Sequence, residues 1–244
     1  MLLRHGESQW NTENRFTGWT DVNLTDRGAS EAINAGKLLN AESFEFDLVY
    51  TSVLKRSINT MKLCLDVMKI KNIKINYDWR LNERHYGALQ GLNKSETAKK
   101  YGDKQVLLWR RSYEISPPLL ELDDNRYPKY DKKYKNLNHN EIPRGESLRD
   151  TVNRVMPLWQ NDILPAMFSG KRILIVAHGN SLRAIVKILD QISNKKIIKL
   201  NIPTGIPLIY ELDKKLNPIK NYYLGDSRDL HERLANVVDQ GKSN

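Results

Sequence analysis

The chain has almost no cysteine and no long apolar run. Cys64 is the single cysteine among 244 residues, so an internal disulfide is excluded, and its apolar neighbours in MKLCLDVM indicate a buried thiol. No apolar stretch reaches the roughly 20 residues that a membrane-spanning helix needs. The start, MLLRHGES, has too few apolar residues for a signal peptide. These absences predict a soluble, cytoplasmic protein.

Acidic residues are also scarce relative to basic ones. The chain carries 39 Lys+Arg against 29 Asp+Glu, a net charge of +10. Such a charge attracts nucleic acid, an anionic membrane or a small anionic substrate, and charge alone does not choose among them. The lysines are scattered in KIKNIK, DKKYK and SNKKIIK without the interleaved aromatics of a nucleic-acid platform. We therefore expect a solvated surface, with no nucleic-acid partner and no membrane partner.

Strand-like and helix-like apolar segments alternate along the chain. Periodicity predicts strands at 2–3, 47–51, 172–177 and 207–212, and helices at 26–40, 53–68, 146–167 and 181–189. A chain of 244 residues can bury its apolar surface in one unit. The sequence predicts a single α/β domain over 1–244, with a mostly parallel central sheet flanked by helices.

Two segments depart from this alternation. Residues from about 82 to 143 contain Pro117-Pro118, Pro128, several tyrosines and many charges, with short helical patterns at 95–101 and 103–111. We expect a long insertion over the active-site end of the sheet. The tail from about 225 to 244 is polar, with a helical pattern in RDLHERLANVV. Whether it is mobile or folds over the site stays open.

Two histidines directly follow predicted strands. Leu2-Leu3 runs into RHGES and RILIVA runs into HGNS. The carboxyl ends of neighbouring parallel strands share one crevice, where open α/β sheets bind ligands. A glycine after each histidine permits close approach of a ligand, and Asn180 or Ser181 can cap a helix whose positive end suits phosphate. One such histidine is more often structural, but the pair indicates an anion-binding catalytic site.

These residues resemble a known family. Arg4-His5-Gly6-Glu7 with His178-Gly179 is similar to the signature of the histidine phosphatase superfamily. Further segments, from Leu2 to about Gly225, resemble its cofactor-dependent phosphoglycerate mutases: ENRFTGWTDVNLT, YTSVLKRSINT, LNERHYGALQGLNK, WRRSY, AHGNSLRAIVK and NIPTGIPLIYEL. The resemblance implies an isomerase of glycolysis and gluconeogenesis that interconverts 3-phosphoglycerate and 2-phosphoglycerate. It further implies a phosphohistidine primed by 2,3-bisphosphoglycerate, and a homodimer or homotetramer.

The resemblance also implies three catalytic roles, and each is chemically sound. A neutral imidazole of His5 is a competent nucleophile toward phosphorus. His178 would stabilise the charge on the oxygens of the transferring group. Glu83 would be the general acid and base for the substrate hydroxyl. Without the resemblance, Glu83 would be taken for a surface carboxylate paired with Arg84.

Further residues match the ligand-contacting positions of that family. Planar guanidinium groups suit phosphate and carboxylate oxygens. The matching anion-binding residues are Arg4, Arg56, Lys94, Arg110 and Arg111. The remaining matches are Asn11, Thr17, Gly18, Tyr86, Gly179 and Asn180. Arg110-Arg111 alone would fit a solvated helix face equally well, and His85 and His139 have no assigned role. No metal is expected, because no Cys, His or carboxylate spacing of a metal site occurs.

One feature departs from the family pattern, and two other functions stay open. Only three residues precede Arg4, so the first strand is expected to be short, either through a truncation that loosens His5 or because the chain is read from an internal methionine. A bisphosphoglycerate mutase or a phosphatase could use the same scaffold. An insertion that closes over the intermediate and excludes water favours the mutase. A nucleic-acid-binding module is motivated by charge alone.

Overall fold

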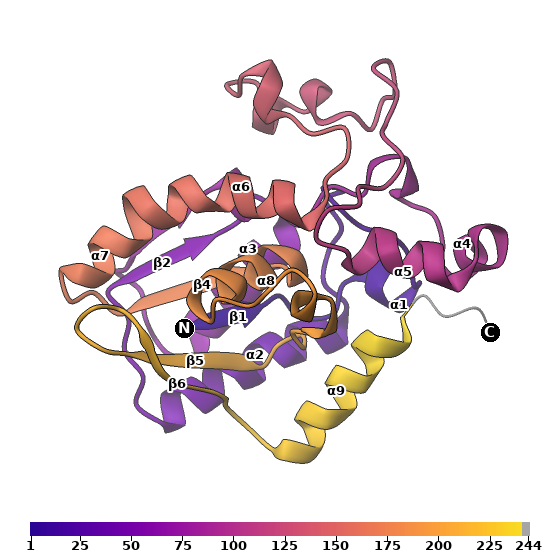
Figure 1. Ribbon diagram of the computed structural model, residues 1–244. Helices are drawn as coiled ribbons and strands as arrows, with labels where there is room; N and C mark the ends of the chain where they lie inside the picture. The colour runs from indigo at the N-terminus through magenta and orange to yellow at the C-terminus, as the bar shows by residue number, and fades with distance from the viewer. Residues whose placement is uncertain (241–244) are drawn as a thin grey trace.

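A computed structural model describes residues 1–240 of the chain, without the side chains of Asn236 and Asp239. Its centre is a six-stranded sheet in the order β3-β2-β4-β1-β5-β6 (Figure 1). The strands are β1 (Leu2–Arg4), β2 (Leu48–Thr51), β3 (Lys74–Tyr77), β4 (Ile173–Ala177), β5 (Pro207–Leu212) and β6 (Pro218–Tyr223). The first four in spatial order pair in parallel, and β5 and β6 are antiparallel. The predicted α/β fold with a mostly parallel sheet is confirmed.

Helices cover both faces of this sheet. On one face α2 (Asp26–Ala41) and α3 (Lys55–Val67) pack over Leu174 and Val176 of β4. On the other face α6 (Leu148–Leu158) and α8 (Gly179–Leu189) pack over Ile173 and Ile175. All five residues of β4 are buried, because a central parallel strand is covered on both sides. Cys64 lies in the α3 layer, where burial raises the pKa of its thiol to about 12.

The structure differs from the predicted elements at the sheet edges and helix starts. Strands β3 (KINY) and β6 (PIKNYY) were not predicted, because edge strands bury little and carry no continuous apolar run. Helix α3 begins at Lys55 rather than at 53, and α8 begins at Gly179 rather than at 181, with His178 as its N-cap. The predicted helix 146–167 is α6, a π-helical turn at Trp159–Ile163, and α7 (Leu164–Phe168).

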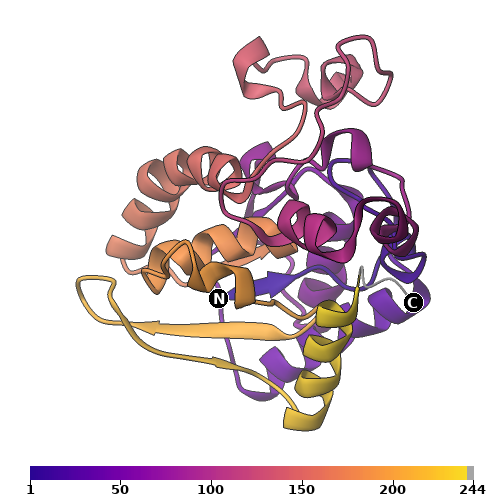
Figure 2. The same ribbon diagram turned by 45° about the vertical axis from the view of Figure 1, so that its right-hand side comes forward.

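The segment between β3 and α6 crosses the carboxyl edge of the sheet. Its first part holds α4 (Lys94–Tyr101) and α5 (Asp103–Arg111). Residues 112–147 then extend away from the body of the molecule, with three single 3₁₀ turns, and return to α6 (Figures 1 and 2). The cover of the site therefore comes from α4 and α5, while the rest of the segment projects from the body.

The tail returns to the same edge. After the β5–β6 hairpin, α9 (Ser227–Asp239) runs back toward α1 (Gln9–Thr12) and α5, as the yellow helix in Figures 1 and 2 shows. Residues 241–244 of the predicted tail lie outside the described residues. Among residues 1–240, no helix is long and apolar enough to cross a membrane.

Candidate active site

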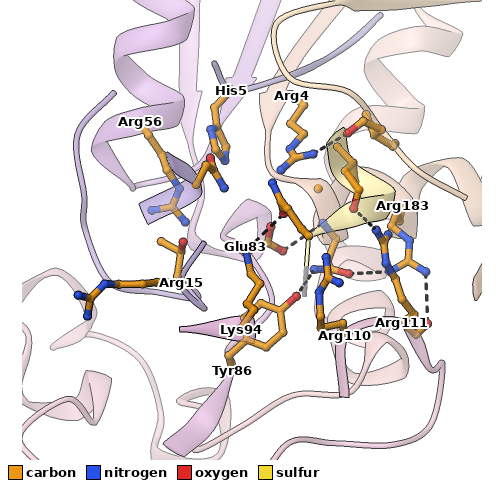
Figure 3. A pocket seen from close by; sticks show the side chains of 17 residues that line it. Arg4, His5, Arg15, Arg56, Glu83, Tyr86, Lys94, Arg110, Arg111 and Arg183 are labelled. Carbon is orange, nitrogen blue, oxygen red and sulfur yellow. Dashed lines mark hydrogen bonds between the residues drawn. The ribbon is translucent and has the colours of Figure 1, made fainter. Parts of the chain in front are cut away.

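A pocket opens at the carboxyl ends of the parallel strands. Arg4 is the last residue of β1 and His5 follows it, Gly179 comes two residues after β4, and Arg56 stands in the first turn of α3, after β2. Figure 3 shows side chains from these elements and from α4 and α5 converging on one space. The residues that line it are Arg4, His5, Asn11, Arg15, Thr17, Arg56, Glu83, Tyr86, Lys94, Arg110, Arg111, Gly179, Asn180, Arg183, Ile202, Val237 and Gln240.

His5 is buried and has a defined tautomer. Its Nδ1 lies 2.7 Å from the carbonyl oxygen of Gly6, which can only accept, so Nδ1 carries the hydrogen. Burial, Arg56 and Arg4 lower the pKa of its imidazole well below the usual value, so the ring is neutral. The other nitrogen, Nε2, therefore keeps a free lone pair. This is the state that a nucleophile requires.

Backbone hydrogen bonds to β4 and to α3 hold the segment that carries His5. The backbone N–H of His5 donates to the Ala177 carbonyl at 3.0 Å, and the N–H of Gly6 donates to Thr60 Oγ1 at 3.0 Å. The three residues of β1 pair in register with Ile175, Val176 and Ala177. The hydrogen bonds that hold His5 are made by His5 and Gly6 themselves, after the last residue of β1. They are therefore present although β1 is short.

His178 stands edge-on to the nucleophile. The two imidazole centroids are 4.9 Å apart with an angle of 60° between the rings, and His178 is fully buried. Its Nε2 lies 2.7 Å from Ser52 Oγ. Burial and Arg56 lower the pKa of this imidazole well below its usual value. His178 does not itself line the pocket, but its ring packs against the ring of His5, which does.

Glu83 is held by backbone groups. Its Oε1 accepts hydrogen bonds from the N–H of Arg84 at 2.7 Å and of Asn180 at 3.1 Å, and the residue is 9% exposed. Arg154 donates to the Glu83 carbonyl and forms a buried ion pair with Glu146 at 2.6 Å. The alternative of a surface carboxylate paired with the Arg84 side chain is therefore wrong. Glu83 is the sole carboxylate among the described residues that line the pocket.

Cationic groups dominate the wall. Seven of the described lining residues are Arg or Lys. The Arg15 guanidinium stands at the rim, where it pairs with Glu13 at 2.6 Å and donates to the Gly91 carbonyl. Arg56 is held by two carbonyls, one of them Gly18 at 2.8 Å. Gly18 therefore supports Arg56 from behind instead of forming the wall.

The cationic residues reach the pocket from two opposite sides. Arg4 and Arg56 belong to the sheet side with His5, whereas Lys94, Arg110 and Arg111 belong to α4 and α5 (Figure 3). Burial and the positive charge of Arg110 lower the pKa of Lys94 well below its usual value. The cationic side chains of the wall repel one another, and a bound anion would offset this repulsion.

The last turn of α9 closes the remaining side. The Val237 carbonyl accepts a hydrogen bond from Arg111 at 3.3 Å, and Gln240 Oε1 accepts one from Lys94 Nζ at 3.3 Å. A helix ends with unpaired carbonyls and a negative dipole end, so this end suits a cationic wall. The tail from 225 therefore folds over the site in the described residues.

The sequence located most of this wall. Every predicted site residue except Gly18 and His178 lines the pocket, and both of these stand directly behind it. Sequence reasoning missed five lining residues: Arg15, Arg183, Ile202, Val237 and Gln240. One signal was available for Arg183, which stands three residues after Asn180 on α8 and donates to its Oδ1 at 2.8 Å.

The unassigned His85 is structural. It is fully buried, its Nδ1 accepts the N–H of Gly87 at 3.0 Å, and burial lowers the pKa of its imidazole to about 3. Within residues 1–240, no group of three or more His, Cys, Asp or Glu side chains is arranged to hold a metal ion.

Comparison with known proteins places this geometry in a family. The profile of the histidine phosphatase superfamily (branch 1) matches residues 1–122 and 119–222. Among solved structures, a mycobacterial glucosyl-3-phosphoglycerate phosphatase is similar with a TM-score of 0.64 and 19% identity, over 91% of this chain and 94% of that one. The alpha-ribazole phosphatase of Shigella flexneri has a TM-score of 0.64 and 21% identity, over 92% and 95%.

A third structure, from an open reading frame of Mycobacterium tuberculosis, has a TM-score of 0.62 and 25% identity, over 92% of this chain and 95% of that chain. At such identities the two named phosphatases support the fold, and they do not single out a phosphoglycerate mutase. The family match covers most of the chain. This protein is a member of branch 1 of the histidine phosphatase superfamily.

Proposed function

We propose that the protein is a phosphoglycerate mutase that interconverts 3-phosphoglycerate and 2-phosphoglycerate through phosphorylated His5. The observation that carries the proposal is the two-sided cationic pocket. Arg4 and Arg56 stand beside the nucleophile, and Lys94, Arg110 and Arg111 face them from the cover. A substrate with a phosphate at one end and a carboxylate at the other satisfies both sides.

The residues of the chain support the chemistry of such a transfer. The free hydroxyl of the substrate attacks the phosphoryl group on His5 while Glu83 takes the hydroxyl proton, and the N–P bond breaks. In the second half, His5 Nε2 forms a bond to the phosphorus of the phosphate ester at the other carbon, the bond between that phosphorus and its ester oxygen breaks, and Glu83 returns the proton to the ester oxygen. Over the two halves, the phosphoryl group moves between the substrate oxygens and His5 Nε2, and Glu83 ends in its starting protonation state.

The donor set also fits 2,3-bisphosphoglycerate, the primer that we propose. Its two phosphates and one carboxylate need more cations than a monophosphate does, and the described wall holds seven cationic residues against one carboxylate. Arg4 and Arg56 would hold the phosphate next to His5, and Lys94, Arg110 and Arg111 the remaining anionic groups. When bound, this compound supplies the phosphoryl group that His5 carries.

A cover that excludes water favours transfer over hydrolysis. Helices α4 and α5 and the last turn of α9 enclose the pocket, and the Val237 carbonyl and Gln240 side chain contact cations of the cover. A phosphohistidine behind such a cover meets the substrate hydroxyl before it meets bulk water. This supports the mutase over the phosphatase.

A phosphatase on the same site is the second candidate. Two of the compared structures are named as phosphatases, and the carboxylate of Glu83 could take a proton from water as readily as from a substrate hydroxyl. We also propose, from the sequence resemblance, a cytoplasmic homodimer or homotetramer, which analytical ultracentrifugation would test.

The deciding experiment follows 3-phosphoglycerate with and without 2,3-bisphosphoglycerate, with 2-phosphoglycerate and free phosphate measured in the same tube. We expect isomer formation that depends on 2,3-bisphosphoglycerate and disappears in His5→Ala, with folding of the variant checked by circular dichroism. Phosphate release without isomer would assign the protein to the phosphatases. Isomer formation that persists in His5→Ala would refute the phosphohistidine.

A further inference from the structure

Arg183 is a buried arginine of α8 that lines the pocket and that the proposed mechanism does not use. The residue is 2% exposed. Its Nη1 donates to Asn180 Oδ1 at 2.8 Å, and its Nη2 donates to the carbonyls of Ile197 at 2.7 Å and Arg111 at 3.3 Å. These acceptors belong to α8, to a 3₁₀ turn after α8, and to the last residue of α5. Arg183 therefore joins α8 to the end of a helix that covers the pocket (Figure 3).

The guanidinium of Arg183 is a buried cation whose three acceptors in the described part of the chain are uncharged oxygens. Burial and the neighbouring Arg84 lower the pKa of Arg183 to about 9, so the group is still protonated at neutral pH. Its Nε is buried without a partner within residues 1–240. A buried charge with no opposite charge beside it opposes folding. The stability of the fold alone therefore does not favour an arginine at this position.

The contact with Asn180 fixes which way the Asn180 amide faces. A guanidinium can donate but not accept, so the amide oxygen must face Arg183. The amide nitrogen then lies on the side of Tyr86, 3.4 Å from its Oη, and both residues line the pocket. An amide turned the other way would present its nitrogen to another donor. Arg183 thus holds the donating end of Asn180 toward Tyr86.

The contact with Arg111 holds the end of α5. Arg111 is the last residue of this helix, so its carbonyl has no partner within the helix, and a cation is favoured at the negative dipole end. The Arg111 side chain donates to the Leu200 and Val237 carbonyls. Its backbone is held by Arg183 and its guanidinium by these two carbonyls. Arg183 therefore helps to fix the part of α5 that presents Arg110 and Arg111.

We propose that Arg183 is a positioning residue for substrate binding, which joins α8 to the end of α5 and so sets the positions of Asn180, Arg110 and Arg111. These residues would hold the anionic end of the substrate that lies away from His5. Contacts to that end are the same in the bound substrate and in the transition state, so their loss raises KM and leaves kcat nearly unchanged. The inference rests on the proposed function, because it assumes a substrate that reaches from His5 to the cover.

The first measurement compares KM and kcat for 3-phosphoglycerate in wild type, Arg183→Met and Arg183→Lys. Methionine is a long side chain without a donor, and we expect Arg183→Met to raise KM roughly 10- to 100-fold, the value of hydrogen bonds from a charged group. Lysine keeps the charge but not the planar fork, so Arg183→Lys should give an intermediate KM. A variant that is only less well folded has fewer active molecules, which lowers kcat and leaves KM unchanged.

The second measurement is hydrogen exchange without substrate. Peptides covering 103–112 should exchange about 10-fold faster in Arg183→Met, because the end of α5 has lost its connection to α8. Peptides covering 55–67 should exchange as in wild type, since α3 lies on the other face of the sheet. Arg144→Met is the matched control, because Arg144 also donates to a backbone carbonyl, that of Leu120, but in the segment that projects from the body. It should match wild type in both measurements.

Two results would overturn the proposal in an active enzyme. One is an unchanged KM in Arg183→Met. The other is a raised KM with unchanged exchange over 103–112, because Arg183 would then act by contacting the substrate itself. If wild type shows no turnover, the proposed function fails, and the exchange over 103–112 alone decides whether Arg183 positions α5. Unchanged exchange there would refute the positioning role as well.

Discussion

Replacing Arg233 by alanine should release helix α9 from the pocket. Arg233 joins α9 to Glu31 of α2 through an ion pair of 2.8 Å, with side chains 12% and 4% exposed. Glu31 also accepts a hydrogen bond from the backbone N–H of Glu7 at 2.9 Å, so it connects α9 to the loop that carries the nucleophile His5. Arg233 further donates to the Thr204 carbonyl at 3.2 Å.

The free-energy cost of Arg233→Ala depends on the partners that the Glu31 carboxylate retains. Breaking a buried ion pair by removing one partner costs roughly 3–5 kcal/mol when the other charge is left alone. Here Glu31 retains the Glu7 N–H and, at 3.4 Å, Arg27, so we expect a cost below that range, about 2 kcal/mol. Since 1.4 kcal/mol is a factor of about 10, the ratio of docked to released α9 should fall about 30-fold.

Hydrogen exchange read by mass spectrometry measures this release. Peptides covering 227–240 should exchange about 30-fold faster in Arg233→Ala, while β4 and α8 stay protected because they lie in a separate core. The yield of isomer relative to free phosphate should fall in parallel. Arg228→Ala, an exposed arginine on the same helix, should change neither. Unchanged exchange over 227–240 in Arg233→Ala would show that this ion pair does not hold the cover.

Three further predictions follow from the packing and the charges. In Gly28→Ala the new Cβ would lie 1.9 Å from the Glu7 carbonyl oxygen; urea unfolding should show a loss of about 1–3 kcal/mol and turnover should slow, whereas the exposed Ser30→Ala on the same helix should do neither. The folded protein lowers the pKa of the His5, His85 and His178 imidazoles, so below pH about 6.5 the unfolded state binds more protons. Stability should therefore fall with decreasing pH, by up to about 1.4 kcal/mol per pH unit for each ring, and a urea midpoint constant from pH 7 to 5 would contradict this. Burial and neighbouring cations lower the pKa of Lys94, and a bound anion should raise it again. Binding of 2,3-bisphosphoglycerate should thus take up protons, seen as a buffer-dependent heat in calorimetry that Lys94→Met reduces; equal heats in all buffers would refute it.

The sequence predicted the parts of the fold whose residues are buried on both faces. Strand β4 reads ILIVA because it is the covered centre of the sheet, and the histidine after it was recognisable for the same reason. Strands β3 and β6 gave no such pattern, since they are edge strands with lysines and exposed positions. Their existence depends on pairing partners that are distant in the chain.

The same limit applies to the site. His5, Glu83 and Arg56 could be found because short motifs carry them. Val237 and Gln240 enter the wall only through the docking of α9 and have no local signal. The Arg233–Glu31 pair between α9 and α2 likewise joins residues about 200 positions apart along the chain.

The pairing of β1 with β4 has a consequence for synthesis. The amino group of Met1 donates to the Ile173 carbonyl, 172 residues away, and the N–H of His5 donates to the Ala177 carbonyl. At about 5–20 residues per second, a ribosome makes the first strand roughly 10 to 30 seconds before its partner strand. Until then Leu2 and Leu3 have no sheet to join, and the nucleophile has no fixed position. The active site is therefore assembled late in translation, after β4 has joined a strand that left the ribosome well before it.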